Sequence, residues 1–70
     1  MSDLAQKIGH AIRKCRVDQQ ITQEKLALLC NIDRSYLGRI ERGEVNITVL
    51  KLFEIARILK VEPYHLLPKD

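Results

Sequence analysis

The chain has 70 residues, which suffice for one small domain but leave little room for a second core or an enclosed active site. Twelve Lys and Arg residues against nine Asp and Glu residues give a formal net charge of +3, and 46% of the residues are hydrophobic. This composition favours a folded domain, and its small excess of basic residues suits a polyanionic partner without demanding one. The longest apolar run is far shorter than a membrane span, and charges occur throughout the N-terminal segment, so we expect neither a membrane-spanning helix nor a signal peptide.

The first predicted element is a helix that begins near Leu4 and runs to about Gln19. Its apolar positions recur every three or four residues, as an amphipathic helix requires, at Leu4, Ile8, Ile12 and Cys15 or Val17. Cys15 and Cys30 lack the paired spacing of a zinc site. Each cysteine lies at an apolar-periodic position, so we interpret both as small buried side chains in a reducing compartment, by default a cytoplasm.

Residues 22–43 are predicted to form two short helices joined by a tight turn. Thr22 is a good N-cap for the first of them, and Asn31, which tolerates a positive φ, should end it. Asp33 is placed to cap the second helix, and Gly43 to end it. The buried faces are predicted at Leu26, Ala27 and Cys30, with Leu29 beside them, and at Leu37 and Ile40. Two helices with so short a turn have the geometry of a helix-turn-helix, whose second helix can enter the major groove of DNA.

The outer face of that second helix is polar and basic. It carries Arg34, Ser35, Gly38, Arg39 and Arg42. Arginines near the leading end of an exposed helix can make bidentate contacts to guanine. Periodicity and charge alone leave two interpretations open, a DNA-reading face and an ordinary solvated basic face.

A further helix is predicted after a loop at residues 44–47, with Thr48 as its cap. Its core-facing stripe is expected at Val49, Leu52, Ile55, Ala56 and Leu59. Leu50, Phe53 and Ile58 remain on its other faces, which is more apolar surface than one small core requires. Pro63 should open a final helical turn, Tyr64 to Leu67, that Pro68 ends. We therefore expect a dimerisation region at residues 48–67, with an interface at Leu50, Phe53, Tyr64 and His65.

The segment TQEKLA, followed by DRSYLGRIERG and an amphipathic helix, resembles the Cro/lambda-repressor type of helix-turn-helix. The resemblance extends from about Ile8 to Leu67. Its most specific parts are Thr22-Gln23-Glu24-x-Leu26-Ala27 and Ser35-Tyr36-Leu37-x-x-Ile40-Glu41-Arg42-Gly43. Within that family, Asp33-Arg34-Ser35-Tyr36 and Asn46-Ile47-Thr48 look most like the small controller proteins of restriction-modification systems. The fold expected is all-α, a compact five-helix bundle of the lambda-repressor-like type, in a single domain spanning residues 1–70.

The exposed basic face and the resemblance together predict roles for particular residues. Base contacts are predicted for Arg34, Ser35 and Arg39. Phosphate contacts are predicted for Gln23, Tyr36, Arg42 and Asn46. The resemblance implies the contact of Gln23, which without it would simply be a tolerated first-turn residue, and Tyr36 could instead pack on thymine methyls or cover the turn. An Arg16–Glu41 pair is implied between the first helix and the recognition helix, whereas the sequence by itself also allows two solvated charges that never meet. Gln20 stands where family members often have a glycine, which leaves the conformation of that loop open.

The sequence leaves two functions open. The first is a sequence-specific transcription regulator that binds double-stranded operator DNA as a homodimer, with RNA polymerase as a further candidate partner. The second is a protein-interaction module, such as an antitoxin-like partner. Enzymatic activity is not expected, because the sequence has no nucleophile elbow, no phosphate-cradling glycine loop and no paired nucleophile and base. His10 and His65 have no partner histidine at metal spacing, so we expect no metal, cofactor or small-molecule ligand.

Overall fold

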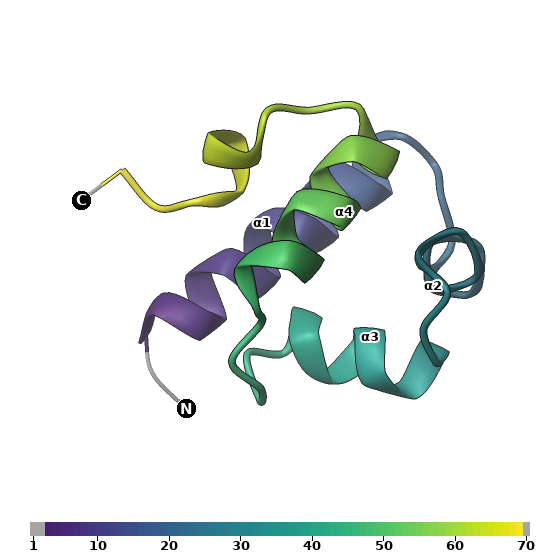
Figure 1. The fold of residues 1–70 in the computed structure, drawn as a ribbon, viewed down its shortest axis with the longest axis horizontal. Helices are drawn as coiled ribbons and strands as arrows, with labels where there is room; N and C mark the ends of the chain where they lie inside the picture. The colour runs from purple at the N-terminus through teal and green to yellow at the C-terminus, as the bar shows by residue number, and fades with distance from the viewer. Residues whose placement is uncertain (1–2, 70) are drawn as a thin grey trace.

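The chain folds into four α-helices followed by one 3-10 helix in the computed structural model, which describes residues 3–69 (Figure 1). In chain order the elements are α1 (Asp3–Asp18), α2 (Gln23–Cys30), α3 (Arg34–Glu41), α4 (Val49–Leu59) and η1 (Pro63–Leu66). In Figure 1, α4 lies in front of α1 and runs in nearly the same direction in this view, α3 runs below them, and α2 is seen nearly end-on beside α3. The all-α fold class is confirmed.

The predicted fifth helix is a 3-10 turn that ends one residue early, at Leu66. Leu67 has an extended backbone, with φ −99° and ψ 145°. Leu67 precedes Pro68, and the proline ring disfavours a helical conformation in the residue before it. The bundle therefore consists of four α-helices closed by a single tighter turn.

Three of the predicted helix caps are confirmed. The hydroxyl of Thr22 accepts a hydrogen bond from the backbone N–H of Lys25 at 3.0 Å. In the same way, Thr48 accepts from the N–H of Lys51 at 3.1 Å. Asn31 ends α2 in the left-handed conformation, with φ 58°. Each of these caps satisfies backbone groups that the helix itself leaves unpaired.

The ends of α3 differ in detail from the prediction. Asp33 occupies the N-cap position, but its side chain makes no capping hydrogen bond. At the other end, Arg42 is the C-cap and Gly43 follows with φ 75°. A β-carbon at Gly43 would lie 2.6 Å from the Cα of Gln6, so both the backbone angle and the space require glycine here.

The core lies where the inner faces of all five elements meet. Its fully buried large side chains are Ile12, Leu26, Leu37, Ile40, Ile55, Leu59 and Leu66. Cys30 is also buried, while Cys15 is half-buried against this core. Burial raises the pKa of the Cys30 thiol above its ordinary value, because the thiolate would lose its hydration there.

Several apolar positions that were expected to be buried are exposed. Leu4, Val17, Leu29 and Val49 are 54%, 49%, 48% and 69% exposed, respectively. Ile58, expected outside the core, is partly buried and packs against it. On α1 the buried face instead includes Ala5, Gly9 and Arg16, because α3 packs closely against it. A periodic pattern therefore placed these helices correctly but not every residue on their faces.

At Gly9 the backbone of α1 comes close to that of α3. A β-carbon there would clash with the carbonyl oxygen of Ile40 and lie 2.7 Å from that of Glu41. Both neighbours are backbone atoms of α3, which cannot move aside without moving the helix. Glycine at this position therefore allows the backbones of the two helices to touch.

The loop after α1 contains a residue in a conformation that glycine adopts more readily. Gln20 has φ 59° and is exposed. For a residue with a β-carbon, the left-handed region costs about 1–2 kcal/mol, and glycine avoids that cost. The glutamine thus adopts the backbone conformation that a glycine would favour.

We expect Gln20→Gly to raise the free energy of unfolding by about 0.5–1 kcal/mol, the relief of strain being partly offset by the greater freedom of glycine in the unfolded chain. Chemical denaturation would measure the change. Arg13→Gly, at an exposed helical position of α1, is the control and should lower stability by about 1 kcal/mol. A loss of stability in Gln20→Gly would contradict the strain argument.

Candidate nucleic-acid interface

The helices α2 and α3 are joined by only three residues, 31–33. The left-handed backbone of Asn31 reverses the chain, and the N–H of Ile32 donates to the carbonyl of Ala27 at 3.0 Å. Leu26, Ala27 and Leu37 are buried between the two helices and the rest of the core. This turn fixes α3 as a short helix with one face packed and the other open.

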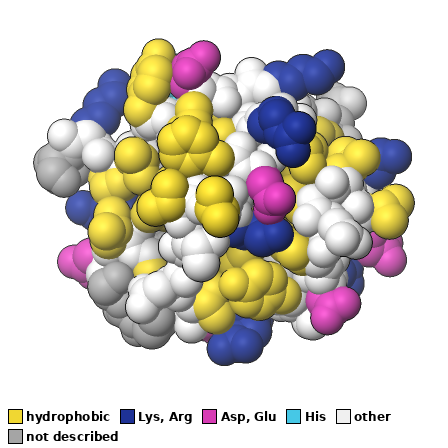
Figure 2. Space-filling view, viewed as in Figure 1, with side chains coloured by type: hydrophobic (Ala, Val, Ile, Leu, Met, Phe, Trp, Pro, Cys, Tyr) yellow, Lys and Arg dark blue, Asp and Glu magenta, His cyan; other side chains and the backbone are white. Residues whose placement is uncertain are grey.

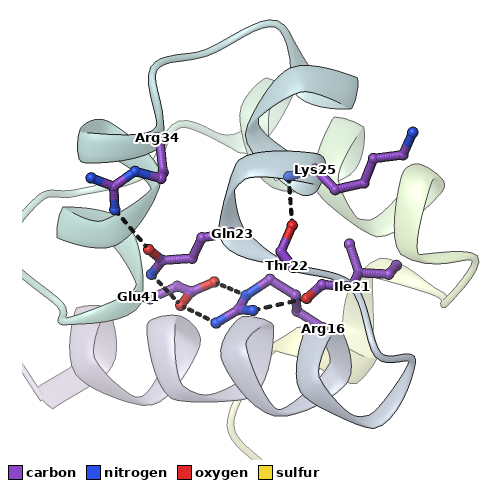
Figure 3. Close-up of polar contacts among 7 residues, drawn as sticks. All are labelled: Arg16, Ile21, Thr22, Gln23, Lys25, Arg34 and Glu41. Atoms are coloured by element: carbon purple, nitrogen blue, oxygen red, sulfur yellow. Dashed lines mark hydrogen bonds and ion pairs between the residues drawn. The ribbon is translucent and has the colours of Figure 1, made fainter.

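A buried ion pair connects α1 to the end of α3. The Nε of Arg16 donates to Oε2 of Glu41 at 2.7 Å, and its Nη2 donates to Oε1 at 3.1 Å (Figure 3). The side chains are only 10% and 2% exposed, respectively. The Nη1 of Arg16 also donates to the backbone carbonyl of Ile21 at 2.8 Å. The guanidinium therefore has partners on three sides, and the expected Arg16–Glu41 pair is present.

Gln23 extends this network from the buried pair towards the surface. Its Nε2 donates to Oε1 of Glu41 at 2.9 Å, while its Oε1 accepts from Nη1 of Arg34 at 3.5 Å (Figure 3). A carboxamide nitrogen has two hydrogens, so one remains for the phosphate contact that the resemblance implies. Because Glu41 can only accept, the nitrogen of Gln23 faces inwards and its oxygen faces Arg34.

The structure exposes the residues to which base contacts were assigned. Arg34, Ser35 and Arg39 are all exposed on α3. Gly38, expected on the same outer face, is buried, since the side chains of Arg42 and Gln23 cover it. A β-carbon at Gly38 would lie 3.1 Å from Nη1 of Arg42.

The residues with expected phosphate contacts occupy different surroundings. Tyr36 is half-buried against the core, next to a groove of about 460 Å³ between α2 and α3. Asn46 is exposed in the loop before α4. Arg42 is exposed at the end of α3, and Gln23 takes part in the buried network.

Glu44 lies in the predicted loop after α3 and contacts two of these arginines. Its carboxylate accepts from Nε of Arg42 at 2.7 Å and from Nη2 at 3.4 Å. It also lies 3.8 Å from Nε of Arg39. The hydrogen bond from Arg42 lowers the pKa of Glu44, and the same bond raises the pKa of Arg42. The sequence feature that could have indicated this contact is a glutamate two residues after Arg42, at the end of a basic helix.

The outer surface of α4 and η1 carries several exposed apolar side chains. Leu50, Phe53 and Tyr64 are 81%, 55% and 67% exposed, and the ring of His65 lies 5.3 Å from that of Tyr64. Figure 2 shows hydrophobic side chains gathered on the face where α4 lies in front. A groove of about 530 Å³ there is lined by Leu50, Phe53, Glu54, Arg57, Val61, Glu62 and Pro63.

Within residues 3–69, no three His, Cys, Asp or Glu side chains are grouped so as to hold a metal ion. None of the helices described is long and apolar enough to cross a membrane.

The tight α2–α3 connection and the exposed basic face of α3 define a helix-turn-helix protein. The helix-turn-helix family model matches residues 12–66, most of the chain. The chain belongs to this family, whose members are DNA-binding transcription regulators and not enzymes.

Relatives among known proteins include restriction-modification controller proteins. The control protein C.BamHI of Bacillus amyloliquefaciens is 37% identical over 60 residues, which cover 84% of this chain and 74% of that one. The control protein C.SmaI of Serratia marcescens is 30% identical over 68 residues, or 97% and 81% of the two chains. The crystal structure of the controller protein C.AhdI from Aeromonas hydrophila superposes with a TM-score of 0.85 at 37% identity, covering 89% of this chain and 94% of that one. The similarity to controller proteins expected from the sequence is confirmed.

We expect Glu41→Ala to lower the free energy of unfolding by about 3–5 kcal/mol, because it leaves the Arg16 guanidinium buried without its counterion. The double variant Arg16→Ala/Glu41→Ala should lose less than the sum of the two single losses. Chemical denaturation of the four proteins measures this coupling. The exposed Lys14–Asp18 pair, with 3.2 Å between Nζ and Oδ2, is the matched control and should give nearly additive losses. Additivity at Arg16 and Glu41 would show that their contact contributes no coupling.

Proposed function

We propose that this protein regulates transcription by binding operator DNA as a homodimer, with α3 of each protomer in the major groove. The observation that carries this proposal is the anchored basic face of α3. Arg34 and Arg39 are exposed there, while the opposite face is fixed to the core by Leu37, Ile40 and the buried Glu41. A rigid helix that presents arginines to solvent is what direct readout of base edges requires.

Arg34, Ser35 and Arg39 are proposed to contact bases, and Gln23, Tyr36, Arg42 and Asn46 to contact phosphates. Base contacts specify a sequence, whereas phosphate contacts position the protein on any duplex. The arginines on α3 suit guanine, since a guanidinium can donate to both O6 and N7.

Substitution of the base-contacting arginines should change specificity. Arg34→Ala or Arg39→Ala is expected to cost about 1–3 kcal/mol of operator binding and to relax preference at particular base pairs. Asn46→Ala, which alters a proposed phosphate contact, should instead weaken binding to all sequences about equally. Binding profiles over a library of operator variants would measure both effects.

A variant at Asn46 tests phosphate contact more cleanly than one at Gln23. Loss of the Gln23 side chain would also remove a hydrogen-bond partner of Arg34, so the effects on phosphate contacts and base contacts could not be separated. Equal losses on every sequence for all three variants would show that the proposed division of roles is wrong.

The second copy in the proposed dimer binds at the outer surface of α4. Leu52, Ile55, Ala56 and Leu59 already face the core, so the exposed Leu50 and Phe53 are available to a partner. The same groove carries Arg57 together with Glu54 and Glu62, opposite charges that a two-fold axis can pair. Such an interface would direct two α3 helices to successive major grooves about 34 Å apart on a roughly palindromic site.

Replacement of the apolar side chains at this surface should abolish dimerisation. We expect Leu50→Glu or Phe53→Glu to give a monomer that binds operator poorly, because one module contacts few base pairs. Leu28→Glu is the control, since Leu28 is 73% exposed on α2 rather than on α4. Sedimentation at micromolar concentration, followed by operator titration, would measure both properties. A monomeric wild type with full operator affinity would contradict the dimer.

The similarity to controller proteins supports a narrower role, the timed expression of a restriction-modification pair. Neighbouring genes for a methyltransferase and an endonuclease would support this role, and their absence would oppose it. The position of the operator relative to the promoter would decide between repression and activation through RNA polymerase.

A protein-interaction module of the antitoxin type is the alternative function, and the exposed apolar surface of α4 is compatible with it. The dependence of binding on salt concentration distinguishes these two functions. DNA binding weakens steeply as salt rises, through counterion release, whereas a hydrophobic protein interface changes little.

A further inference from the structure

The end of the recognition helix carries a carboxylate among arginines that are proposed to bind DNA. Glu44 uses both oxygens on Arg42, accepting from Nε at 2.7 Å and from Nη2 at 3.4 Å. A phosphate group binds an arginine through two oxygens in the same manner. While Glu44 holds it, the Nε–Nη2 edge of Arg42 is not available to the DNA backbone, and only the terminal hydrogens on Nη1 and Nη2 remain.

Arg39 lies beside the same carboxylate but is engaged differently. Its Nε is 3.8 Å from Oε1 of Glu44, so the carboxylate faces the side of the guanidinium. At this separation Nε makes no hydrogen bond to Glu44. A pair of terminal nitrogens can donate to O6 and N7 of guanine.

Stability does not account for this arrangement. The side chains of Arg39, Arg42 and Glu44 are 54%, 59% and 49% exposed, and ion pairs exposed to this degree contribute little to folding. We therefore expect Glu44 to affect the binding of charged molecules to this surface.

We propose that Glu44 is a specificity determinant, which competes with phosphate for Arg42 and places a negative charge beside Arg39, and so weakens non-specific DNA binding more than operator binding. The inference rests on the proposed function. Glu44 would act as a positioning residue through the two arginines.

The difference between the two kinds of binding follows from their sources of free energy. Non-specific binding comes almost entirely from neutralised phosphates, so a carboxylate that occupies one arginine and repels the backbone reduces it directly. Operator binding also draws on base contacts, whose free energy does not come from neutralised phosphates, so it is reduced by a smaller fraction. Arg42 lowers the pKa of Glu44, so the carboxylate stays ionised at neutral pH.

The test is the variant Glu44→Gln, measured on a selected operator and on an unrelated duplex over a range of salt concentrations. Affinity for the unrelated duplex should rise roughly 3- to 10-fold at low salt, and its dependence on log salt should steepen by about one unit, as one more phosphate contact predicts. Operator affinity should rise less or fall, so the ratio of operator to non-specific affinity decreases.

Two controls isolate the role of Glu44. Asp18→Asn removes an exposed carboxylate of α1 that is paired with Lys14 and should leave the affinity ratio unchanged. In an Arg42→Ala background, Glu44→Gln should lose most of its effect on the unrelated duplex, because the arginine that it releases is gone.

The outcomes separate this inference from the proposed function. An unchanged affinity ratio in Glu44→Gln, the same change in Asp18→Asn, or a full effect without Arg42 would overturn the role of Glu44 while leaving DNA binding intact. A wild-type protein with no salt-dependent DNA binding would instead overturn the proposed function, and the role of Glu44 with it. Denaturation curves identify any variant that has failed to fold.

Discussion

The buried contact between Arg16 and Glu41 is the constraint from which the rest of the interface follows. Two charges removed from water lose their hydration, and only close geometry with further hydrogen bonds offsets that loss. The 2.7 Å and 3.1 Å contacts, together with the bond from Arg16 to the carbonyl of Ile21, supply this geometry. It is available only because Gly9 lets the backbone of α1 touch that of α3. The pair therefore fixes the orientation of α3 more than it adds to stability.

The same carboxylate controls polar groups nearer the surface. Glu41 can only accept hydrogen bonds, so it turns the nitrogen of Gln23 inwards and the oxygen of Gln23 towards Arg34. Gln23, at the start of α2, thus connects the buried carboxylate of Glu41 to the exposed guanidinium of Arg34 on α3. Buried polar networks of this kind act as units, because leaving one member unpaired in a low-dielectric interior is costly.

Local chemistry was predictable from the sequence, whereas close packing was not. The caps at Thr22, Asn31 and Thr48 depend on hydrogen bonds within a few residues, and their side chains suffice to identify them. Exposure of Val49 depends on where α4 enters the core, which no local pattern records. The Arg16–Glu41 pair was inferred through family resemblance and not from spacing. The contacts of Glu44 were not predicted, because they depend on the left-handed backbone conformation of Gly43.

These constraints divide α3 into positions that the fold fixes and positions that it leaves open. Leu37 and Ile40 fill the core, and Glu41 holds the buried pair, so a change at any of them disturbs the helix itself. Arg34, Ser35 and Arg39 are exposed and form no part of the core. Surface positions of this type tolerate substitution with small effects on stability. The scaffold can therefore carry different side chains at the open positions while α1 and α4 keep the same packing. Under the proposed function, such substitutions would alter sequence preference without refolding the domain.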